Sequence, residues 1–298
     1  MPSFFDKFFR SKPKVEEEIL TPENSVDLQA IVVSDLGNIR TNNEDCALFV
    51  RPNDLAMRSS KGYLGIVADG MGGHAAGEVA SHLAVETIRK VYYESDDSIE
   101  RSLKEAFRMA NSKIHGEASK DSKRRGMGTT ATTVVMLDGM LQIAHVGDSR
   151  LYSISQEGIS QLSSDHTYVQ EMIRKGDMIA EEAARHPDRN ILTRAMGTQP
   201  QVEVEWQSMP YEWKSGNRLL LCSDGLYDYL ADDEIREILM QNELRPAAYK
   251  LVEIAKERGG HDNITVLIIE AVKEDNKTAK PTRNVEDTQK ETREIGLD

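Results

Sequence analysis

The chain has 298 residues, of which 39% are hydrophobic and 29% are charged, which suits a folded globular protein and excludes an intrinsically disordered one. Acidic side chains outnumber basic ones by 50 to 37, so the formal net charge of −13 argues against nucleic acid as a partner. No apolar run approaches the length of about 20 residues that a membrane span needs, and no signal peptide is expected.

Composition divides the chain into three regions. Residues 1–26 are expected to be a flexible N-terminal extension, and residues 27–272 have the pattern of a folded domain. Residues 273–298 are expected to be a disordered tail, because 13 of these 26 residues are charged and few are apolar.

The N-terminal extension is rich in phenylalanine. If residues 4–9 are helical, Phe4, Phe5, Phe8 and Phe9 lie on one face, which would allow docking or weak contact with a membrane surface. An extension without such a role is an equal alternative. In the tail, Thr282, Thr288 and Thr292 are accessible to a kinase, although a purely solubilising tail also explains this composition.

Apolar or alternating runs bounded by Gly, Asp and Asn predict strands, and the 3.6-residue period predicts helices. The predicted strands are 28–34, 45–50, 63–68, 130–137, 141–146, 151–154, 202–207, 218–222 and 264–271. The predicted helices are 75–93, 99–119, 168–175, 180–184, 232–242 and 246–258. Because strands and helices do not alternate strictly, this order favours an α+β fold of mainly antiparallel sheets with helices on their outer faces.

Aspartates recur at the ends of the predicted strands, beside small residues. They are Asp69, Asp148, Asp224 and Asp262. One such aspartate is most often a turn residue. Four clustered carboxylates in an acidic protein repel one another, so we expect a bound cation that neutralises them. Because the ligands are oxygens without His or Cys, Mg²⁺ or Mn²⁺ is favoured.

A second group lies in the segment SDLGNIRTNNED, residues 34–45. Arg40 has a planar guanidinium that suits a bidentate grip on phosphate, although a surface pair with Glu44 is an equal alternative.

Six motifs follow one another across Val33–Asn263: SD-x-G-x-x-R-x-x-NED, ADGMGGH-x-x-GE, GMGTT, GDSR, SDGL-x-D and GG-x-DN. In this order they resemble the bacterial branch of the type 2C family of metal-dependent serine/threonine protein phosphatases. The resemblance implies a four-layer αββα sandwich, two mainly antiparallel sheets flanked by helices, with a two-metal centre at one end.

The resemblance also assigns roles to residues of this chain. It implies that Asp69 bridges two Mn²⁺ or Mg²⁺ ions, that Asp224 and Asp262 complete one of them, and that Glu44 and the Gly70 carbonyl serve the other. Asp148, with Asp224 and Asp228, resembles the site of a weaker third ion. Arg40 matches the phosphate clamp, and Asp45 and Asn263 match residues that hold the ligands in place.

The chemistry implied is hydrolysis of phosphoserine and phosphothreonine in proteins by a water that two metal ions activate. The partners implied are phosphorylated proteins, including a Ser/Thr kinase and its substrates. We expect a cytoplasmic monomer. Eukaryotic members have His where this chain has Met71, which cannot donate a proton, so the general acid is not identified; His74 is more simply a structural residue.

The segment 163–197 resembles the flap beside the active site of this family. In it, Asp165, His166 and Arg194 are candidates for substrate contact, and solvated loop residues are the simpler alternative. The two cysteines, Cys46 and Cys222, stand far apart, and we expect reduced, buried thiols.

Two other functions fit parts of the sequence. A phosphoprotein-binding pseudophosphatase would show degraded metal ligands, whereas Glu44 and the four aspartates are all present. A dinucleotide-binding enzyme would use the G-x-G-x-x-A pattern at residues 70–75. Asp69 would then face the pyrophosphate, which makes this alternative weaker.

Overall fold

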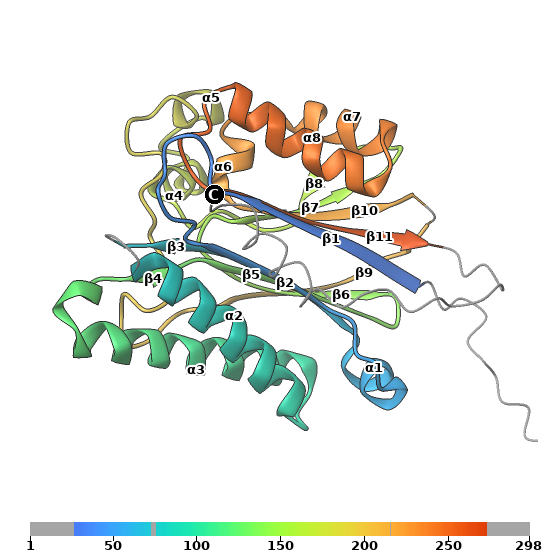
Figure 1. Ribbon diagram of the computed structural model, residues 1–298, viewed down its shortest axis with the longest axis horizontal. Coiled ribbons are helices and arrows are strands. Elements are labelled where there is room, and N and C mark those ends of the chain that lie inside the picture. The colour runs from blue at the N-terminus through green and yellow to red at the C-terminus, as the bar shows by residue number, and fades with distance from the viewer. Residues whose placement is uncertain (1–26, 73–75, 215, 273–298) are drawn as a thin grey trace, which may run out of the picture. The chain divides into compact units, whose positions relative to one another are not determined.

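The computed structural model describes residues 27–72, 76–214 and 216–272 (Figure 1). The phenylalanine-rich start, His74 and the threonines of the tail lie outside these residues. The boundaries near residues 26 and 273 therefore stay predictions, as do the roles suggested for both ends of the chain.

Two antiparallel sheets lie at the centre of the described region. The first has the order β1 (Asp27–Asp35), β11 (Ile264–Val272), β10 (Arg218–Cys222), β7 (Arg150–Ile154), β8 (Ile159–Gln161). The second has the order β2 (Asp45–Val50), β3 (Tyr63–Met71), β5 (Ala131–Leu137), β6 (Met140–Val146), β9 (Glu205–Pro210), and the short β4 (Gly128–Thr129) pairs with β3.

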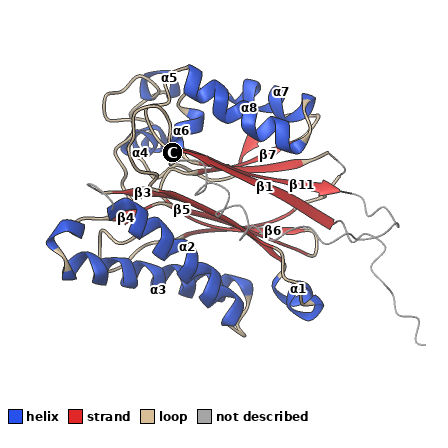
Figure 2. Ribbon diagram, viewed as in Figure 1, coloured by secondary structure: helices blue, strands red, loops and turns tan. Residues whose placement is uncertain are grey.

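Helices cover the outer faces of both sheets (Figure 2). The second sheet is covered by α2 (Ala76–Glu94) and α3 (Ile99–Lys120), and the first by α7 (Asp232–Gln241) and α8 (Leu244–Glu257). The remaining helices are short: α1 (Leu55–Lys61), the 3-10 turn η1 (Ser122–Arg124), α4 (Tyr168–Lys175), α5 (Ala180–Ala183) and α6 (Asp224–Tyr227). The predicted α+β sandwich with helical outer layers is confirmed.

Strand alternation explains why the sheets pack on both faces. In β10, Leu220 and Cys222 belong to the apolar cluster beneath α7 and α8, whereas the equally buried Leu219 and Leu221 point to the opposite face. The second sheet lies there: a Cβ on Gly65 of β3 would come within about 3.1–3.2 Å of side chains on β11. The strands are therefore apolar runs, as sandwich cores require.

The helices bury one stripe each. In α2, Ala80, Ala84, Ile88 and Tyr92 recur at every fourth position and are fully buried against the second sheet. None of the helices within the described ranges combines the length and the apolar character needed to cross a bilayer.

Most predicted elements agree with the structure within two residues. Strand β3 extends three residues beyond its predicted end, to Met71, and β9 runs over Glu205–Pro210 rather than over residues 202–207. The short helices α1 and α6, the turn η1 and the strands β4 and β8 were not predicted. The dinucleotide-binding alternative is wrong for this fold. Within the described residues, β3 pairs only antiparallel with its neighbours, and no parallel βαβ unit forms around it.

The strand register brings the acidic motifs to one edge. Asp45 at the start of β2 lies opposite Asp69 near the end of β3. In the other sheet, Cys222 at the end of β10 pairs with Arg150 at the start of β7 and with Val266 near the start of β11. Asp148, two residues before Arg150, and Asp224, two residues after Cys222, must therefore lie close together.

Candidate active site

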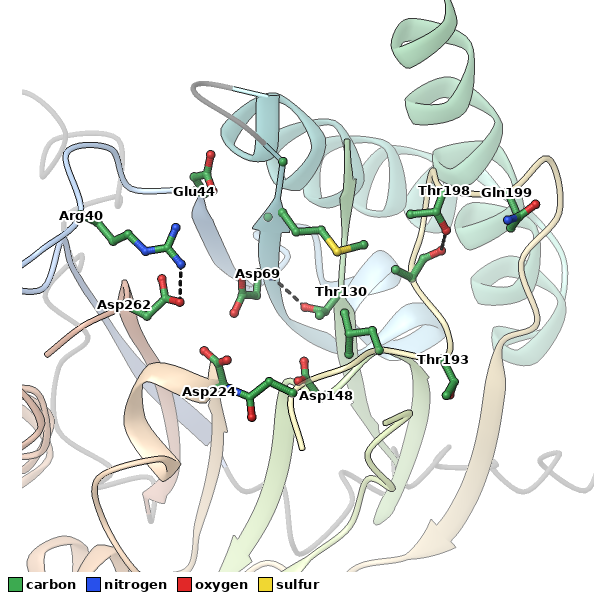
Figure 3. Close-up of a pocket in the computed structure, with 16 residues that line it drawn as sticks. Arg40, Glu44, Asp69, Thr130, Asp148, Thr193, Thr198, Gln199, Asp224 and Asp262 are labelled. Carbon is green, nitrogen blue, oxygen red and sulfur yellow. Dashed lines mark hydrogen bonds and ion pairs between the residues drawn. The ribbon is translucent and has the colours of Figure 1, made fainter. Parts of the chain in front are cut away.

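A cavity of about 570 Å³ opens at this edge, between the ends of the two sheets (Figure 3). Its lining contains all the residues expected to bind the two core ions and the phosphate, together with Asp148 of the expected third site. These are Arg40, Glu44, Asp69, Gly70, Asp148, Asp224 and Asp262. Asp228, the other carboxylate expected only at the third site, does not line the cavity. Figure 3 shows Asp69, Asp148 and Asp224 around one space, with Arg40 and Asp262 on one side of it.

Asp69 is fixed by the segment around β4. Its backbone N–H donates to the Thr130 hydroxyl at 2.8 Å, and its carbonyl accepts from the Thr130 N–H at 2.8 Å. The Thr129 hydroxyl donates to the same carbonyl at 2.9 Å. The GMGTT motif thus holds the main chain of Asp69, which leaves its carboxylate free to face the cavity.

Two glycines allow the chain to pass where a side chain would not fit. A Cβ on Gly70 would lie 2.2 Å from the Gly77 carbonyl oxygen and 2.5 Å from that of Glu44. Gly147, directly before Asp148, has a φ of 109° and packs against Thr130. These close approaches bring the start of α2 and the Asp148 turn against the Asp69 strand.

Arg40 and Asp262 form an ion pair at the rim of the cavity. The Arg40 Nη2 lies 2.6 Å from Asp262 Oδ2, and the side chains are 45% and 37% exposed. Arg40 is therefore paired with a predicted metal ligand rather than with Glu44, which was the alternative partner suggested by the sequence.

Asn263 ties the Arg40 loop to the start of β11. Its Oδ1 accepts from the Glu44 N–H at 2.8 Å, and its Nδ2 donates to the carbonyls of Leu36 and Asn42, both at 3.0 Å. Asp45 has a comparable position: it is buried, and its carboxylate accepts from the Ser223 hydroxyl at 2.8 Å. Both residues support the cavity without lining it.

Burial and mutual repulsion raise the pKa values of the clustered carboxyl groups. For Asp69 and Asp224 the pKa lies well above the ordinary range, first because of burial and then because of the neighbouring aspartates. Burial, with repulsion from Asp165, raises the pKa of Asp148 to about 7. Several buried carboxylates without enough positive charge form a site that favours a cation.

One oxygen of this cluster has no partner. Among the described residues, the buried side-chain oxygens that lack any hydrogen bond are Asp224 Oδ1 and Thr87 Oγ1, and only Asp224 lines the cavity. An unpaired, buried carboxylate oxygen is costly, and a divalent cation would satisfy it. The donor set is all oxygen, which fits Mg²⁺ or Mn²⁺.

The carboxylates do not form a closed cage. Within the part of the chain that the structure describes, no three acidic, His or Cys side chains converge closely enough to hold an ion by themselves. An open arrangement suits Mg²⁺, which usually retains several waters and takes only one or two carboxylates from the protein.

Tyr227 and Arg150 lie beside Asp148. The Tyr227 hydroxyl donates to the Asp148 carbonyl at 3.1 Å, and the Arg150 guanidinium stacks 3.6 Å from the Tyr227 ring centre. Asp228 is close enough to raise the pKa values of both Asp148 and Asp224, and it pairs with Arg189 at 3.5 Å.

The three flap residues suggested by the sequence do not line the cavity. Asp165 is engaged by Arg150 through contacts of 2.7–3.1 Å. His166 is buried, accepts from the Gly147 N–H at Nδ1 and donates from Nε2 to Glu205. Arg194 lies 3.3 Å from Glu203. These contacts position the flap rather than a substrate.

Other residues of the flap segment and of the loop after it line the cavity instead. They are Asn190, Leu192, Thr193, Ala195, Thr198 and Gln199. The sequence analysis did not single them out, because uncharged residues in a loop carry no distinctive pattern. Met71 also lines the cavity, so the position that lacks a histidine does face the site.

Comparison with known proteins identifies the family. The sequence profile of the family described as protein phosphatase 2C matches residues 50–265. The serine/threonine phosphatase Stp of Listeria innocua is 38% identical over 243 residues, which covers 80% of this chain and 93% of that relative.

Solved structures share the fold as well. A serine/threonine phosphatase from S. agalactiae superposes with a TM-score of 0.75 at 33% identity, covering 83% of this chain and all of the other. The catalytic domain of the phosphatase PstP, solved in complex with two manganese ions, gives a TM-score of 0.70 at 34% identity and covers 83% and 99% of the two chains. Both the sequence profile and these relatives extend over most of the chain, and the chain belongs to the protein phosphatase 2C family.

Proposed function

We propose that this chain is a metal-dependent phosphatase that removes phosphate from phosphoserine and phosphothreonine in proteins. The observation that carries the proposal is the joint lining of one cavity by Glu44, four aspartates and Arg40. The aspartates are Asp69, Asp148, Asp224 and Asp262. Relatives named serine/threonine phosphatases, and the manganese complex of PstP, support it.

The carboxylates would hold two core Mn²⁺ or Mg²⁺ ions. In our assignment Asp69 would be shared by both ions, Asp224 and Asp262 would hold one, and Glu44 with the Gly70 carbonyl would hold the other. When bound, such ions would supply Lewis-acid stabilisation and would lower the pKa of a coordinated water, which is the chemistry that hydrolysis of a phosphate ester at neutral pH needs. A third, weaker ion at Asp148, Asp224 and Asp228 is part of the proposal and is supported by the proximity of these three carboxyl groups.

Arg40 binds the phosphate of the substrate. Its side chain is nearly half exposed and lines the cavity, and Asp262 is its one carboxylate partner among the described residues, so it can turn to the phosphate at little cost. Its guanidinium donors would also stabilise charge on the phosphoryl oxygens in the transition state. Met71 offers no proton, so the leaving alkoxide takes its proton from another group.

The substrates and partners follow from the same activity. We infer that phosphorylated proteins bind at the open mouth of the cavity and that the enzyme acts opposite a Ser/Thr kinase. A cytoplasmic location and a monomeric state remain part of this proposal. Intact ligand positions make a pseudophosphatase the weaker alternative.

The test is release of phosphate from a phosphothreonine peptide by the purified chain with Mn²⁺. We expect activity that excess EDTA abolishes and fresh Mn²⁺ restores, with phosphotyrosine peptides cleaved more slowly. Asp69→Asn should remove nearly all activity, whereas Asp177→Asn, at an exposed position on the flap, should not. Full activity in EDTA or in Asp69→Asn would overturn the proposal.

A further inference from the structure

A second cavity, of about 340 Å³, adjoins the active site. Its walls come from the last turns of α3, from residues 121–126 around η1, and from Gly197 and Thr198. Thr198 lines both cavities, so the two share a wall. A polypeptide whose phosphorylated residue occupies the active site has this second cavity within reach of its neighbouring residues.

The shared wall is fixed to α3. Asn111 Oδ1 accepts from the Gly197 N–H at 2.7 Å, and Asn111 Nδ2 donates to the carbonyls of Gln199 and Pro200. His115 Nδ1 lies 3.1 Å from the Gly197 carbonyl oxygen, close enough for its N–H to donate. Since these contacts hold the loop on both sides of Thr198, the second cavity is formed before any ligand binds.

The segment beside this cavity is basic in an acidic protein. Residues 120–125, with the sequence KDSKRR, carry four basic side chains and one acidic one, in a chain with a net charge of −13. Lys120 and Arg124 pair with Glu117 at 2.6 Å and 3.5 Å. Arg125 lines the cavity, is exposed, and has no ion pair or side-chain hydrogen bond with any residue in the described ranges.

The single carboxylate in the lining is already engaged. Asp121 Oδ1 accepts from the Lys123 N–H at 2.9 Å, as a cap of the short η1 turn. The guanidinium of Arg125 therefore remains available for an anionic group that enters the cavity from outside.

We infer that this second cavity binds the stretch of substrate that flanks the phosphorylated residue, and that Arg125 selects an anionic side chain there. The inference rests on the proposed function and adds a determinant of substrate choice. A carboxylate of Asp or Glu and a second phosphorylated residue share the required chemistry. The chain as a whole carries a net charge of −13, so recognition of acidic substrates benefits from such a local positive contact.

The experiment uses phosphothreonine peptides in which one Glu is moved from five positions before the phosphothreonine to five positions after it, in an alanine background. We expect kcat/KM of the wild type to rise by about two- to fivefold for Glu at one or two adjacent positions, the size of a contact between exposed charges. Phosphoserine at the same position, in place of Glu, shows whether a carboxylate or a phosphate is preferred.

Variants of Arg125 and Lys123 distinguish binding in the second cavity from a general effect of positive charge. Arg125→Ala should remove the positional preference and leave hydrolysis of p-nitrophenyl phosphate unchanged, because that substrate is too small to reach the second cavity. Lys123→Ala removes an equal charge two residues away, from a side chain outside the lining, and should keep the preference. Arg125→Glu should reverse it in favour of a basic residue.

A flat positional profile in the wild type, or equal losses in Arg125→Ala and Lys123→Ala, would overturn the inference while p-nitrophenyl phosphate hydrolysis upholds the proposed function. If the wild type hydrolyses neither the peptides nor p-nitrophenyl phosphate with Mn²⁺, the proposed function itself is wrong and the inference falls with it.

Discussion

Replacing Asn263 tests whether the loop that carries Arg40 and Glu44 is held by side-chain hydrogen bonds. The side chain is only 4% exposed and makes three bonds to that loop, one to the Glu44 N–H and two to main-chain carbonyls. Asn263→Ala removes all three and leaves their partners without a protein contact.

The expected loss of stability follows from that count. A typical hydrogen bond contributes about 1 kcal/mol, and a buried group left unpaired costs somewhat more. The free energy of unfolding should therefore fall by about 2–4 kcal/mol. Because Glu44 and Arg40 would also lose their fixed positions, kcat/KM should fall by about 10- to 100-fold, as for other residues that orient ligands.

Asn263→Asp keeps the size and shape of the side chain but changes its hydrogen-bonding groups. It keeps the acceptor for the Glu44 N–H but turns a carboxylate oxygen toward the two carbonyls that now receive the Nδ2 protons. It also adds a negative charge beside Asp262. At neutral pH we expect a loss of stability at least as large as that of the alanine variant.

The assay is urea unfolding of the metal-free protein, followed by Mn²⁺ titration of p-nitrophenyl phosphate hydrolysis. Asn38→Ala is the matched control, because its Nδ2 also donates to two carbonyls, those of Lys256 and Gly259, but from an exposed position on the same loop. It should cost under about 1 kcal/mol. If Asn263→Ala stayed within about 0.5 kcal/mol of the wild type with unchanged kcat/KM, the network would not hold the loop.

Three further predictions concern phosphate binding, metal binding and pH. Arg40→Ala should mainly raise KM for phosphorylated substrates, and Arg40→Lys should recover only part of the loss, because an ammonium lacks the forked donors. Asp148→Ala should lower kcat while two Mn²⁺ ions still bind by calorimetry; loss of both would refute a separate third site. Burial lowers the pKa of His145 from 6.5 to about 4. Between these two pH values the folded chain therefore binds fewer protons than the unfolded chain. The contribution of His145 to the free energy of unfolding should be lost as the pH falls through this range. Urea unfolding should show a weaker loss toward low pH in His145→Gln than in the wild type, and parallel pH profiles would contradict this.

The strand ends of the site were predictable from the sequence, because their pattern is local. An apolar run followed by Asp and Gly marks both the end of a buried strand and the aspartate that leaves it, as at Asp69 and Asp224. The fold then brings such ends to one edge, where both aspartates line the same cavity.

The flap was not predictable in the same way, because the contacts of its charged residues join distant parts of the chain. Arg150 binds Asp165 across 15 residues, and His166 reaches Gly147 and Glu205 on different elements. Neither partner can be chosen from local periodicity. The residues that do face the cavity from this region, such as Thr193, are ordinary loop residues in the sequence.

The ion pair between Arg40 and Asp262 links the residue proposed to bind phosphate to a residue proposed to bind metal. An ion pair between side chains that are 45% and 37% exposed contributes at most about 1 kcal/mol, so it is easily exchanged for stronger contacts. With Asp262 engaged as a metal ligand, its charge would be shared with a cation, and Arg40 would lose most of the attraction that holds it there. The guanidinium is then free to meet the phosphate. Until both ligands are present, each side chain keeps the other at the rim of the cavity, and neither charge is left without a partner.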